Sequence, residues 1–577
     1  MRRKLALPLA LAAAVLVAAT ACSSPSSSSS ASGGSPGGSP GGSPGGSSGP
    51  NAENAAKVAS SVTDYNPQPY ENIKDGGTYT TAGTFDEQGN PFNVNGTLNS
   101  SRIWSWYNAH AITYSPTGEV QYNPDYYSDV KVSVEGGDQK VVITLNPKAV
   151  FNDGTPIDWR AIEATWKANN GSDKDYAASS TDGYDRITSV TRGADDKQAV
   201  ITFKGVNASW SALFTTFLHP QAATVDNFNK AYVKTAHPEW GTGPYTVGTW
   251  DEHSGNITFV RNPNWWGRPG KLDKRVYVNL ESAASINAFK NGELDYAPVG
   301  TAENLKQVRT VKDAEIRSGG SPFEYALYLN AKSPFLGDVQ VRKAVQESID
   351  RPQITKIRFQ GLDYTEPLPG SAVLYSFQQG YQDNVAAVLK YDPQEARKTL
   401  DAAGWKPGAD GIRAKDGKQL ELGYTVLGDD PIEKATAGAL TAMLKAVGVK
   451  VNVNKVSEND FSKVLSDRRF DLFISGNRST DPFGARYLCD FYCSDRDSNI
   501  TGAGTPELDK EIRATGEIAD LGQQVAAVNK VEQKALQQYA FLPLYSGPST
   551  YGIRKGLANV GATIFYSPLP ETIGWQK

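Results

Sequence analysis

The sequence predicts an α/β protein of several domains that follows an export signal and a long linker. Apolar and polar residues alternate at 130–134 and 141–145, a pattern typical of half-buried strands. Helix start signals, such as Asp392-Pro393 with Glu395 three residues after the aspartate, are interspersed with these strands. The body after the linker has about 500 residues, which exceeds one simple core. We therefore expect two or three α/β domains.

The first 22 residues have the pattern of an export signal. Positive residues 2–4 precede residues 5–19, which are almost wholly apolar. This run is shorter than the roughly 20 apolar residues of a transmembrane helix and fits a signal peptide. It ends in Ala-Thr-Ala before Cys22, which resembles the lipobox of bacterial lipoproteins. We expect residues 1–21 to be a lipoprotein signal peptide and Cys22 to carry the lipid at the extracellular face of the cell membrane. The alternative is an ordinary cleaved signal in which Cys22 has no role.

Residues 22–69 are predicted to form a flexible tether. Residues 23–50 are Ser, Gly and Pro with one Ala, and Gly-Gly-Ser-Pro repeats run from 33 to 46. Such a segment has no apolar side chains to bury and does not offset the entropy of ordering. Treated as a coil, the tether has a reach of roughly 35–40 Å. It would hold the folded body away from the membrane.

Composition excludes several classes of function. The chain has 58 Lys and Arg against 62 Asp and Glu, for a net charge of −4, which argues against nucleic acid as a partner. No second apolar run is long enough to span a membrane. The sequence contains no G-x-S-x-G, H-E-x-x-H or paired-carboxylate motif, so we expect neither an enzyme nor a cofactor.

Two of the three cysteines, Cys489 and Cys493, lie close together in the sequence. In an oxidising exterior this pair predicts a small local disulfide. The alternative is two thiols bound to a metal, but no further Cys or His lies nearby to complete a tetrahedral site. The four histidines have no metal-ligand spacing, so we expect no metal site.

Further strands and helices are expected along the rest of the chain. Asp338 precedes a helical repeat of apolar residues spaced four apart, and Gly404 and Gly448 follow two other helical patterns. The remaining expected elements are strands at 187–191, 199–203, 450–456 and 470–475, and helices at 432–447 and 521–539.

Six short segments carry a specific resemblance. They are Phe151-Asn152-Asp153-Gly154-Thr155-Pro156; Gly241-Thr242-Gly243-Pro244-Tyr245; Arg261-Asn262-Pro263-Asn264-Trp265-Trp266; Pro334-Phe335 with Asp338–Ala344; Tyr391-Asp392-Pro393 with Ala403-Gly404-Trp405; and Phe470-Asp471 with Asp481-Pro482. In this order they resemble motifs of the family 5 extracellular solute-binding proteins, the oligopeptide-, dipeptide- and nickel-binding components of ABC importers. The resemblance extends from residue 75 to 560.

The resemblance implies a two-lobed, periplasmic-binding-protein-like clamshell of three domains. Its expected parts are lobe I at 70–115, 219–320 and 546–577, an inserted accessory domain at 116–218, and lobe II at 321–545. The chain would cross between the lobes near Gly320 and Ser546, and these crossings would form a hinge. The implied mechanism is closure of the lobes on a small-molecule or peptide ligand. The resemblance also implies delivery to membrane permease subunits that a separate ATPase drives, and we expect a monomer.

The resemblance also points to candidate ligand-binding residues in lobe II. Peptide-binding members pair the free amine of the peptide with an Asp in a G-W-x-x-D segment before D-P. Here Gly476 is followed by Asn477 at the Trp position, and Arg478 falls at the Asp position. An arginine repels an ammonium group and attracts an anion. Either Asp481 takes the amine role, or the ligand is not presented amine-first, or Arg478 is a solvated residue at a strand end.

In lobe I, the loop after the opening strand usually lines the cleft in this family. The corresponding residues here are Asn95, Gly96 and Thr97, with Trp104 beyond them. Trp104 and Trp106 do not share a helical face, so one is expected to face the cleft and the other the core.

Three functions remain open from the sequence. The first is capture of oligopeptides for an ABC importer. The second is the same machine with a non-peptide ligand, such as a sugar, a metallophore or an amphiphile. The third is a regulatory lipoprotein that does not transport and acts by protein contact.

Overall fold

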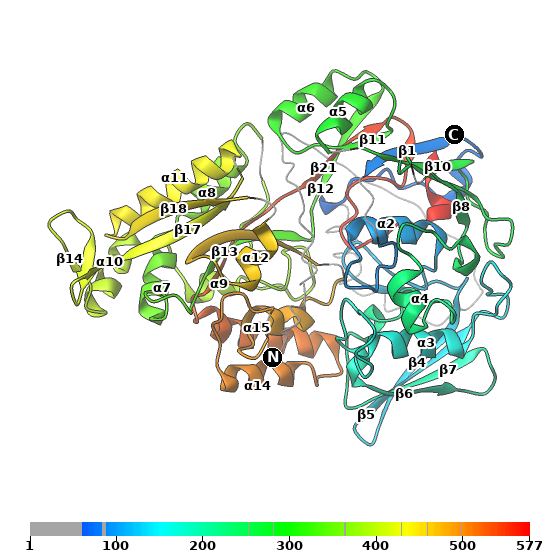
Figure 1. The fold of residues 1–577 in the computed structure, drawn as a ribbon, viewed down its shortest axis with the longest axis horizontal. Coiled ribbons are helices and arrows are strands. Elements are labelled where there is room, and N and C mark those ends of the chain that lie inside the picture. Colours follow the sequence, from blue (N-terminus) through cyan, green and yellow to red (C-terminus); the bar gives the residue numbers. More distant parts are fainter. Residues whose placement is uncertain are drawn as a thin grey trace, which may run out of the picture.

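The computed structural model describes residues 61–83, 88–251, 253–280, 282–362, 365–428, 430–457, 460–479, 481–496 and 498–577, which form two lobes side by side (Figure 1). Cys22, the signal peptide and most of the expected tether lie outside these residues. No helix in the described ranges is both long and apolar enough to cross a membrane.

Lobe I is built on a seven-stranded mixed sheet with the order β12-β21-β11-β1-β10-β9-β8. Its strands are β1 (Thr78–Gly83), β8 (Tyr245–Trp250), β9 (Ile257–Arg261), β10 (Lys274–Asn279), β11 (Tyr296–Pro298), β12 (Ala314–Gly319) and β21 (Ser549–Arg554). Its longer helices are α2 (Leu98–Tyr107), α5 (Ser282–Lys290) and α6 (Ala302–Arg309). The central strand β1 runs parallel to β10 and β11, so segments far apart in the sequence meet in one sheet.

The accessory unit is a four-stranded antiparallel sheet beside lobe I, with the order β4-β5-β7-β6. Its elements are β4 (Tyr127–Glu135), β5 (Asp138–Leu145), α3 (Trp159–Asn169), β6 (Ile187–Arg192) and β7 (Gln198–Phe203). Gly136 and Gly137 join β4 to β5 with φ angles of 63° and 94°, which only glycine adopts without strain and which a two-residue hairpin requires. The predicted hairpin is therefore present.

Lobe II is built on a five-stranded sheet with the order β18-β17-β19-β13-β20. Its strands are β13 (Phe323–Leu329), β17 (Glu421–Leu427), β18 (Lys450–Val456), β19 (Leu472–Arg478) and β20 (Phe541–Ser546). Its helices are α7 (Val339–Glu347), α8 (Arg351–Arg358), α9 (Asn384–Val388), α10 (Pro393–Ala402), α11 (Pro431–Ala446), α12 (Phe461–Ser466), α13 (Leu488–Tyr492), α14 (Pro506–Thr515) and α15 (Leu521–Leu536). Strands β17, β18 and β19 are parallel, and β13 and β20 are antiparallel to their neighbours.

Shorter elements complete the fold. They are β2 (Ile112–Tyr114) with β3 (Val120–Tyr122), β14 (Lys406–Pro407) with β15 (Arg413–Lys415) and β16 (Lys418–Gln419), β22 (Leu557–Ala558) with β23 (Gly574–Trp575), and α4 (Val225–Lys230).

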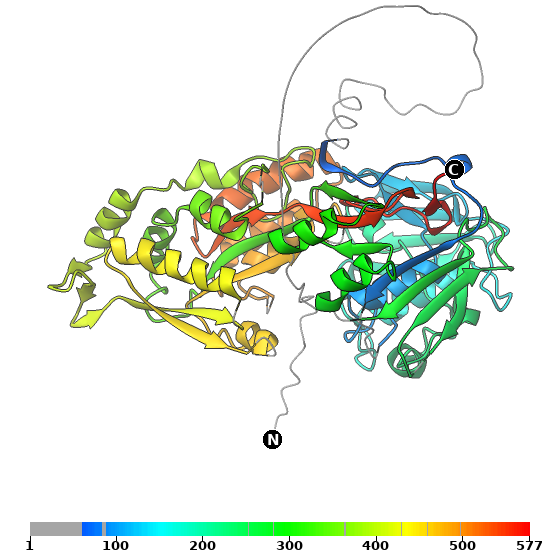
Figure 2. The same cartoon turned by 90° about the horizontal axis from the view of Figure 1, so that it is seen from above.

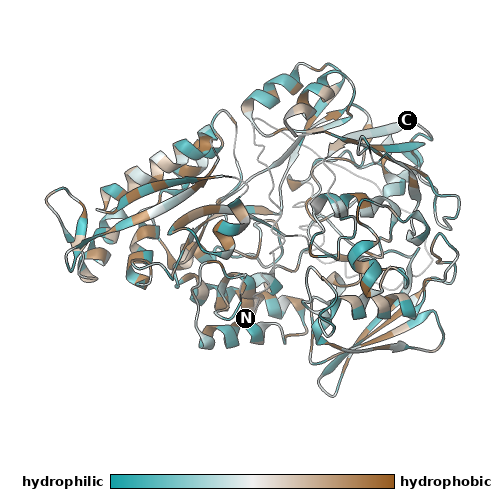
Figure 3. Cartoon of the chain, viewed as in Figure 1, coloured by the Kyte–Doolittle hydropathy of each residue, from teal (hydrophilic) through white to brown (hydrophobic). Residues whose placement is uncertain are grey.

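Helix starts in lobe II follow the signals in the sequence. The side chain of Asp392 accepts hydrogen bonds from the backbone amides of Gln394 and Glu395 at the start of α10, and Asp338 accepts one from Gln340 at the start of α7. Hydrophobic residues gather on the strands and on the sides of the helices that face them (Figure 3). Burial of these faces against the sheet holds lobe II together.

The two lobes are joined by two adjacent strand connections. β12 leads into β13 through residues 320–322, and β20 leads into β21 through residues 547 and 548. Because β12 pairs with β21 and β13 pairs with β20, the two connections run side by side from lobe to lobe (Figure 2). The α/β class and the two-lobed architecture expected from the sequence are therefore found, while the residue boundaries of the domains stay predictions.

Candidate ligand-binding cavity between the lobes

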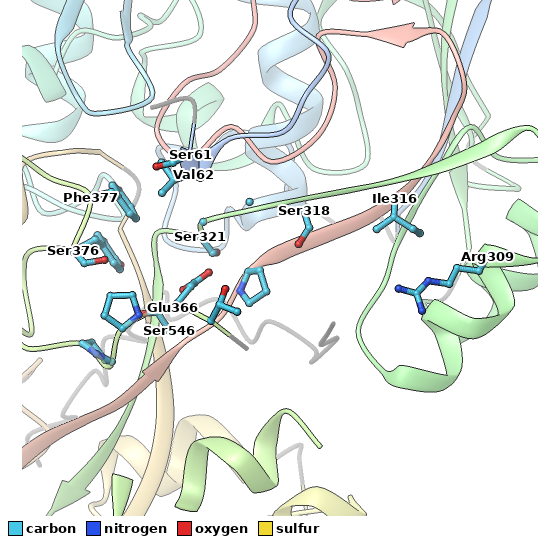
Figure 4. A pocket seen from close by; sticks show the side chains of 17 residues that line it. Ser61, Val62, Arg309, Ile316, Ser318, Ser321, Glu366, Ser376, Phe377 and Ser546 are labelled. Carbon is cyan, nitrogen blue, oxygen red and sulfur yellow. The ribbon is translucent and has the colours of Figure 1, made fainter. Parts of the chain in front are cut away.

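A cavity of about 460 Å³ lies beside the two strand connections. Lobe I and lobe II both contribute to its walls (Figure 4). Lobe I and the connections supply Arg309, Ile316, Ser318, Gly319, Gly320, Ser321, Ser546 and Pro548, lobe II supplies Thr365, Glu366, Pro367, Pro369, Tyr375, Ser376 and Phe377, and Ser61 and Val62 complete the lining. A solute held there would contact both lobes and the segments that join them.

The lining combines apolar surface with a few polar groups. Prolines and two aromatic rings provide the apolar part, and hydroxyl groups and two charged side chains, Arg309 and Glu366, provide the polar part. The volume is within the range of roughly 300–1,000 Å³ that is usual for small-ligand sites. Burial raises the pKa of the Glu366 carboxyl to about 7.

Asp481, the candidate for pairing with a ligand amine, is already engaged within lobe II. Its side chain is buried, with 7% of the residue exposed. One carboxylate oxygen accepts the backbone amide of Phe483 at 2.9 Å, and the other accepts the Tyr487 hydroxyl at 2.6 Å. The same oxygen pairs with Arg486 at 3.4 Å. These bonds organise the turn after β19.

The other three candidates of lobe II lie at the end of β19. Gly476 faces aromatic side chains, because a Cβ there would lie 2.3 Å from the ring of Phe323. The Asn477 amide donates a hydrogen bond to the Tyr328 hydroxyl. Arg478 is exposed at the strand end, opposite Phe323 in register. Asn477 and Gly476 therefore have structural partners, whereas the guanidinium of Arg478 faces solvent.

The end of β19 is close to the cavity, although it does not line it. The hydroxyl of Tyr375, a lining residue, lies 3.2 Å from the Ser479 hydroxyl. Burial raises the pKa of Tyr375, and the positive charge of Arg478 is among the groups that oppose this rise. Arg478 is thus on the side of lobe II where Tyr375 meets the cavity.

In lobe I, Asn95, Gly96 and Thr97 form the turn that starts α2. The Thr97 hydroxyl accepts the backbone amides of Asn99 and Ser100 as the helix cap. Gly96 is needed for close packing, since a Cβ there would lie 2.5 Å from the carbonyl oxygen of Asn90. The backbone amide of Asn95 donates to the Asn93 side chain at 3.0 Å. Each residue therefore has a local role in the turn.

Trp104 differs from the expectation that it faces the cleft. It is 3% exposed and packs against Phe92 and Tyr232 at ring distances of 6.2 and 5.4 Å. Its indole nitrogen donates to the Thr216 hydroxyl at 3.1 Å. Trp106 is buried as well, in the neighbouring core cluster. Two residues on different helical faces are both buried because α2 is covered on both sides. Trp104 is thus a core residue of lobe I.

None of the eight ligand-binding candidates predicted from the sequence is among the described residues that line the cavity. The two charged lining residues, Arg309 and Glu366, were not predicted from the sequence. Glu366 lies in the segment Thr-Glu-Pro-Leu-Pro, and Arg309 is the exposed last residue of α6. Neither position has a motif that distinguishes it from an ordinary surface charge, so only the fold shows that both face one cavity.

The structure joins Cys489 and Cys493 in a disulfide within and just after α13. Cys493 is buried in the core of lobe II. Among the described residues, no group of three or more His, Cys, Asp and Glu is placed to hold a metal ion.

Comparison with known proteins agrees with this architecture. The sequence profile of the bacterial extracellular solute-binding proteins, family 5 Middle, matches residues 122–499, which is more than half of the chain. The oligopeptide-binding proteins OppA of Mycobacterium bovis and Mycobacterium tuberculosis are 33% identical over 523 residues, covering 89% of this chain and 87% of each relative. A probable monoacyl phosphatidylinositol tetramannoside-binding protein, LpqW of Mycobacterium tuberculosis, is 24% identical over 384 residues and covers 60% of this chain and 59% of its own length.

Solved structures share the fold at lower sequence identity. The periplasmic EDTA-binding protein EppA superimposes with a TM-score of 0.81 at 22% identity, covering 89% of this chain and 98% of EppA. The oligopeptide-binding protein AppA of Bacillus subtilis, in complex with a nonapeptide, superimposes with a TM-score of 0.70 at 18% identity, covering 88% of this chain and all of AppA.

Fold and sequence together place the chain among two-lobed solute-binding proteins. The chain belongs to the bacterial extracellular solute-binding proteins of family 5. Its members are binding proteins rather than enzymes.

Proposed function

We propose that this chain is the lipid-anchored, extracellular solute-binding component of an ABC importer, and that it captures oligopeptides and delivers them to a membrane permease driven by a separate ATPase. The observation that carries the proposal is the cavity whose walls come from both lobes and from the two strand connections. The relatives named oligopeptide-binding proteins support the peptide as ligand.

Closure of the lobes is the proposed mechanism of capture. The connections at 320–322 and 547–548 are short and adjacent, so they allow the lobes to rotate relative to one another. A ligand that contacts both lobes favours the closed state by its differential affinity for that state. The closed protein would then bind the permease as a monomer. We propose the domain ranges given above as the rigid parts of this motion.

The anchor at Cys22 and the tether to residue 69 complete the proposal. They would keep the binding protein near its permease at the outer face of the cell membrane. Replacement of Cys22 by Ala should release the protein into the medium, as a Western blot of cell and medium fractions would detect. Retention of the variant on the membrane would contradict the anchor.

A second ligand class is favoured by particular relatives. LpqW is named for binding a mannosylated lipid, and EppA for binding EDTA. A non-peptide ligand in the same cavity is therefore the alternative to a peptide, and a regulatory lipoprotein that acts by protein contact is a third candidate. Mass spectrometry of the ligand that co-purifies from the native host separates the first two. A substitution that blocks the cavity without changing the cellular phenotype would favour the third.

The candidate residues at the end of β19 enter the proposal as supports of the cavity, whereas those in the turn before α2 support the local fold of lobe I. We infer that Asp481 shapes the turn after β19 and that Arg478 attracts an anionic solute toward the cavity from outside its lining. Comparison of a free and an N-acetylated peptide by calorimetry, with the unmodified protein and Asp481→Asn, tests the first inference. A preference for the free amine that Asp481→Asn alone abolishes would return the amine-binding role to Asp481.

A further inference from the structure

Two charged side chains face the inter-lobe cavity from opposite lobes. Arg309 is the last residue of α6 in lobe I, and Glu366 belongs to the lobe II segment that begins at Thr365. Figure 4 shows Arg309 on one side of the strand connections and Glu366 on the other. All other described residues that line the cavity are uncharged. The described part of the lining therefore has one cationic and one anionic side chain.

Both charged groups are available to a ligand. Within the part of the chain that the structure describes, no hydrogen bond or ion pair engages the side chain of Arg309 or of Glu366. Asp481 differs in this respect, because its two oxygens are bonded to Phe483, Tyr487 and Arg486. Glu366 is half-buried, and a half-buried carboxylate without a partner is unfavourable, so a cationic group of a ligand would relieve this penalty. Arg309 is exposed, and its guanidinium is open to an anionic group from solvent.

Among the described residues, the titratable side chains that line the cavity are Arg309, Glu366 and Tyr375. Burial raises the pKa of Glu366 to about 7. Burial also raises the pKa of Tyr375, so this phenol is uncharged at neutral pH. Glu366 is thus the lining group whose charge changes near neutral pH.

We propose that Glu366 binds a cationic group of the solute and Arg309 an anionic group, so that the cavity selects a dipolar solute such as a peptide with a free amine and a free carboxylate. This inference rests on the proposed function and deepens it by naming the charged groups of the solute that the site recognises. Arg309 and Glu366 become specificity-determining residues, and Asp481 a positioning residue.

The geometry links recognition to closure. Because Arg309 belongs to lobe I and Glu366 to lobe II, a dipolar solute engages both charges only when it spans the cavity. Charge-assisted hydrogen bonds are shorter and stronger than neutral ones. A solute that lacks one of the two charges loses one of these bonds and part of its preference for the closed form.

Calorimetry on the full chain tests the assignment, with tetra-alanine as the probe. The peptide is used with free ends, N-acetylated, and C-amidated. We expect Glu366→Gln to weaken binding of the free peptide by about tenfold and to leave binding of the N-acetylated peptide unchanged. Arg309→Gln should weaken binding of the free peptide by a similar factor and leave the C-amidated peptide unchanged.

Two variants serve as matched controls. Lys306→Gln removes an exposed positive charge from the same helix as Arg309, and Glu507→Gln removes an exposed negative charge from α14, away from the cavity. Both should bind all three peptides as the unmodified protein does. A loss of affinity in the controls as large as in the cavity variants would overturn the assignment.

Proton release on binding gives a second readout, which compares the unmodified protein with Glu366→Gln. A cationic ligand that binds the ionised carboxylate displaces the proton of Glu366 near pH 7. The binding enthalpy of free tetra-alanine at pH 7 should therefore change with the ionisation enthalpy of the buffer, and this dependence should vanish in Glu366→Gln. A dependence that persists in the variant contradicts the assignment.

The outcomes separate this inference from the proposed function. Binding of tetra-alanine that neither Glu366→Gln nor Arg309→Gln alters overturns the charge assignment and leaves peptide capture intact. Absence of binding to the unmodified protein contradicts peptide capture and the charge assignment together.

Discussion

Arg186 of the accessory unit donates a hydrogen bond to Glu517 of lobe II, with 2.8 Å between Nη2 and Oε1. Nearby, Asp182 and Arg496 approach to 3.8 Å across the same boundary. The ring of Tyr114 also meets that of Phe483 at 5.8 Å. Lobe II therefore contacts the accessory unit and β2 directly, in addition to its covalent connections to lobe I. We expect these contacts to break when the lobes open.

Loss of the Arg186 contact should favour the open form. Both side chains are partly exposed, and such ion pairs contribute about 0.2–1 kcal/mol. If the pair forms only when the lobes are closed, Arg186→Gln lowers the closed population and weakens binding of tetra-alanine by about two- to fivefold. The difference should shrink in 1 M salt, where the Debye length is about 3 Å.

Arg192→Gln is the matched control for this change. Arg192 pairs with Asp196 at 2.5 Å, and both residues belong to the accessory unit. Small-angle scattering of the ligand-free proteins should show a larger radius of gyration for Arg186→Gln than for Arg192→Gln. Equal radii and equal affinities would show that the pair does not hold the lobes together.

Glu532 should be a major support of the cavity wall. Its buried carboxylate accepts hydrogen bonds from the Ser371 hydroxyl at 2.7 Å, the Ala372 amide at 2.6 Å and the Asn384 side chain at 2.6 Å. These bonds fix the segment that carries Tyr375 and Phe377 onto α15. Glu532→Ala leaves several buried donors without an acceptor, and we expect a loss of stability of about 3 kcal/mol or more.

Glu532→Gln keeps one acceptor and should lose less stability than Glu532→Ala. Lys530→Ala, at an exposed position of the same helix, should change the unfolding free energy by less than about 0.5 kcal/mol. Urea unfolding followed by tryptophan fluorescence measures the three variants. A Glu532→Ala protein as stable as Lys530→Ala would mean that the network contributes little.

The sequence predicts the fold well because its signals are local. The hairpin at Gly136-Gly137, the cap at Asp392 and the strand at 450–456 each depend on turn chemistry, capping or periodicity over a few residues. The small shifts occur at element ends, as in β19, which begins at Leu472 and continues to Arg478. Helix and strand ends depend on neighbours in space, which periodicity does not show.

The cavity could not be predicted in the same way. Arg309 and Glu366 meet one cavity because two lobes and two strand connections place them there, and no short pattern links positions so far apart in the chain. Trp104 was misplaced for a related reason. Its helix α2 is covered on both faces by residues distant in sequence, such as Tyr232 on one side and Phe259 near Trp106 on the other. Only tertiary packing decides which face remains open.

Removal of the disulfide should destabilise lobe II modestly. Cys489 and Cys493 close a loop of only a few residues, for which the chain-entropy relation gives about 2 kcal/mol. We expect the double change Cys489→Ala and Cys493→Ala to lower the unfolding free energy by about this amount. Reductant should lower the midpoint of the unmodified protein and leave that of the double variant unchanged. An equal decrease of the midpoint in both proteins would show that the reductant does not act through this disulfide.

Glu571 should make stability fall as the pH rises. It is 2% exposed, and burial together with the nearby charge of Asp125 raises its pKa from 4.5 to about 7, despite the opposing Arg268. Between pH 4.5 and about 7, Glu571 is therefore protonated in the folded protein and ionised in the unfolded chain. Stability from this group is complete below pH 4.5 and is lost as the pH rises through about 7.

The expected size of this loss is about 3 kcal/mol between pH 4 and pH 8. Glu571→Gln stays uncharged throughout this range, so its free energy of unfolding should rise relative to that of the unmodified protein by about this amount as the pH increases. Urea unfolding at a series of pH values measures this difference. Glu507→Gln, at an exposed position, is the control, and its free energy of unfolding should differ from that of the unmodified protein by the same amount at every pH. Because Glu366 titrates in the same range and is unchanged in both proteins, its contribution cancels in the comparison. A difference that stays constant with pH would show that the pKa of Glu571 is the same in the folded and unfolded protein, which contradicts the raised pKa.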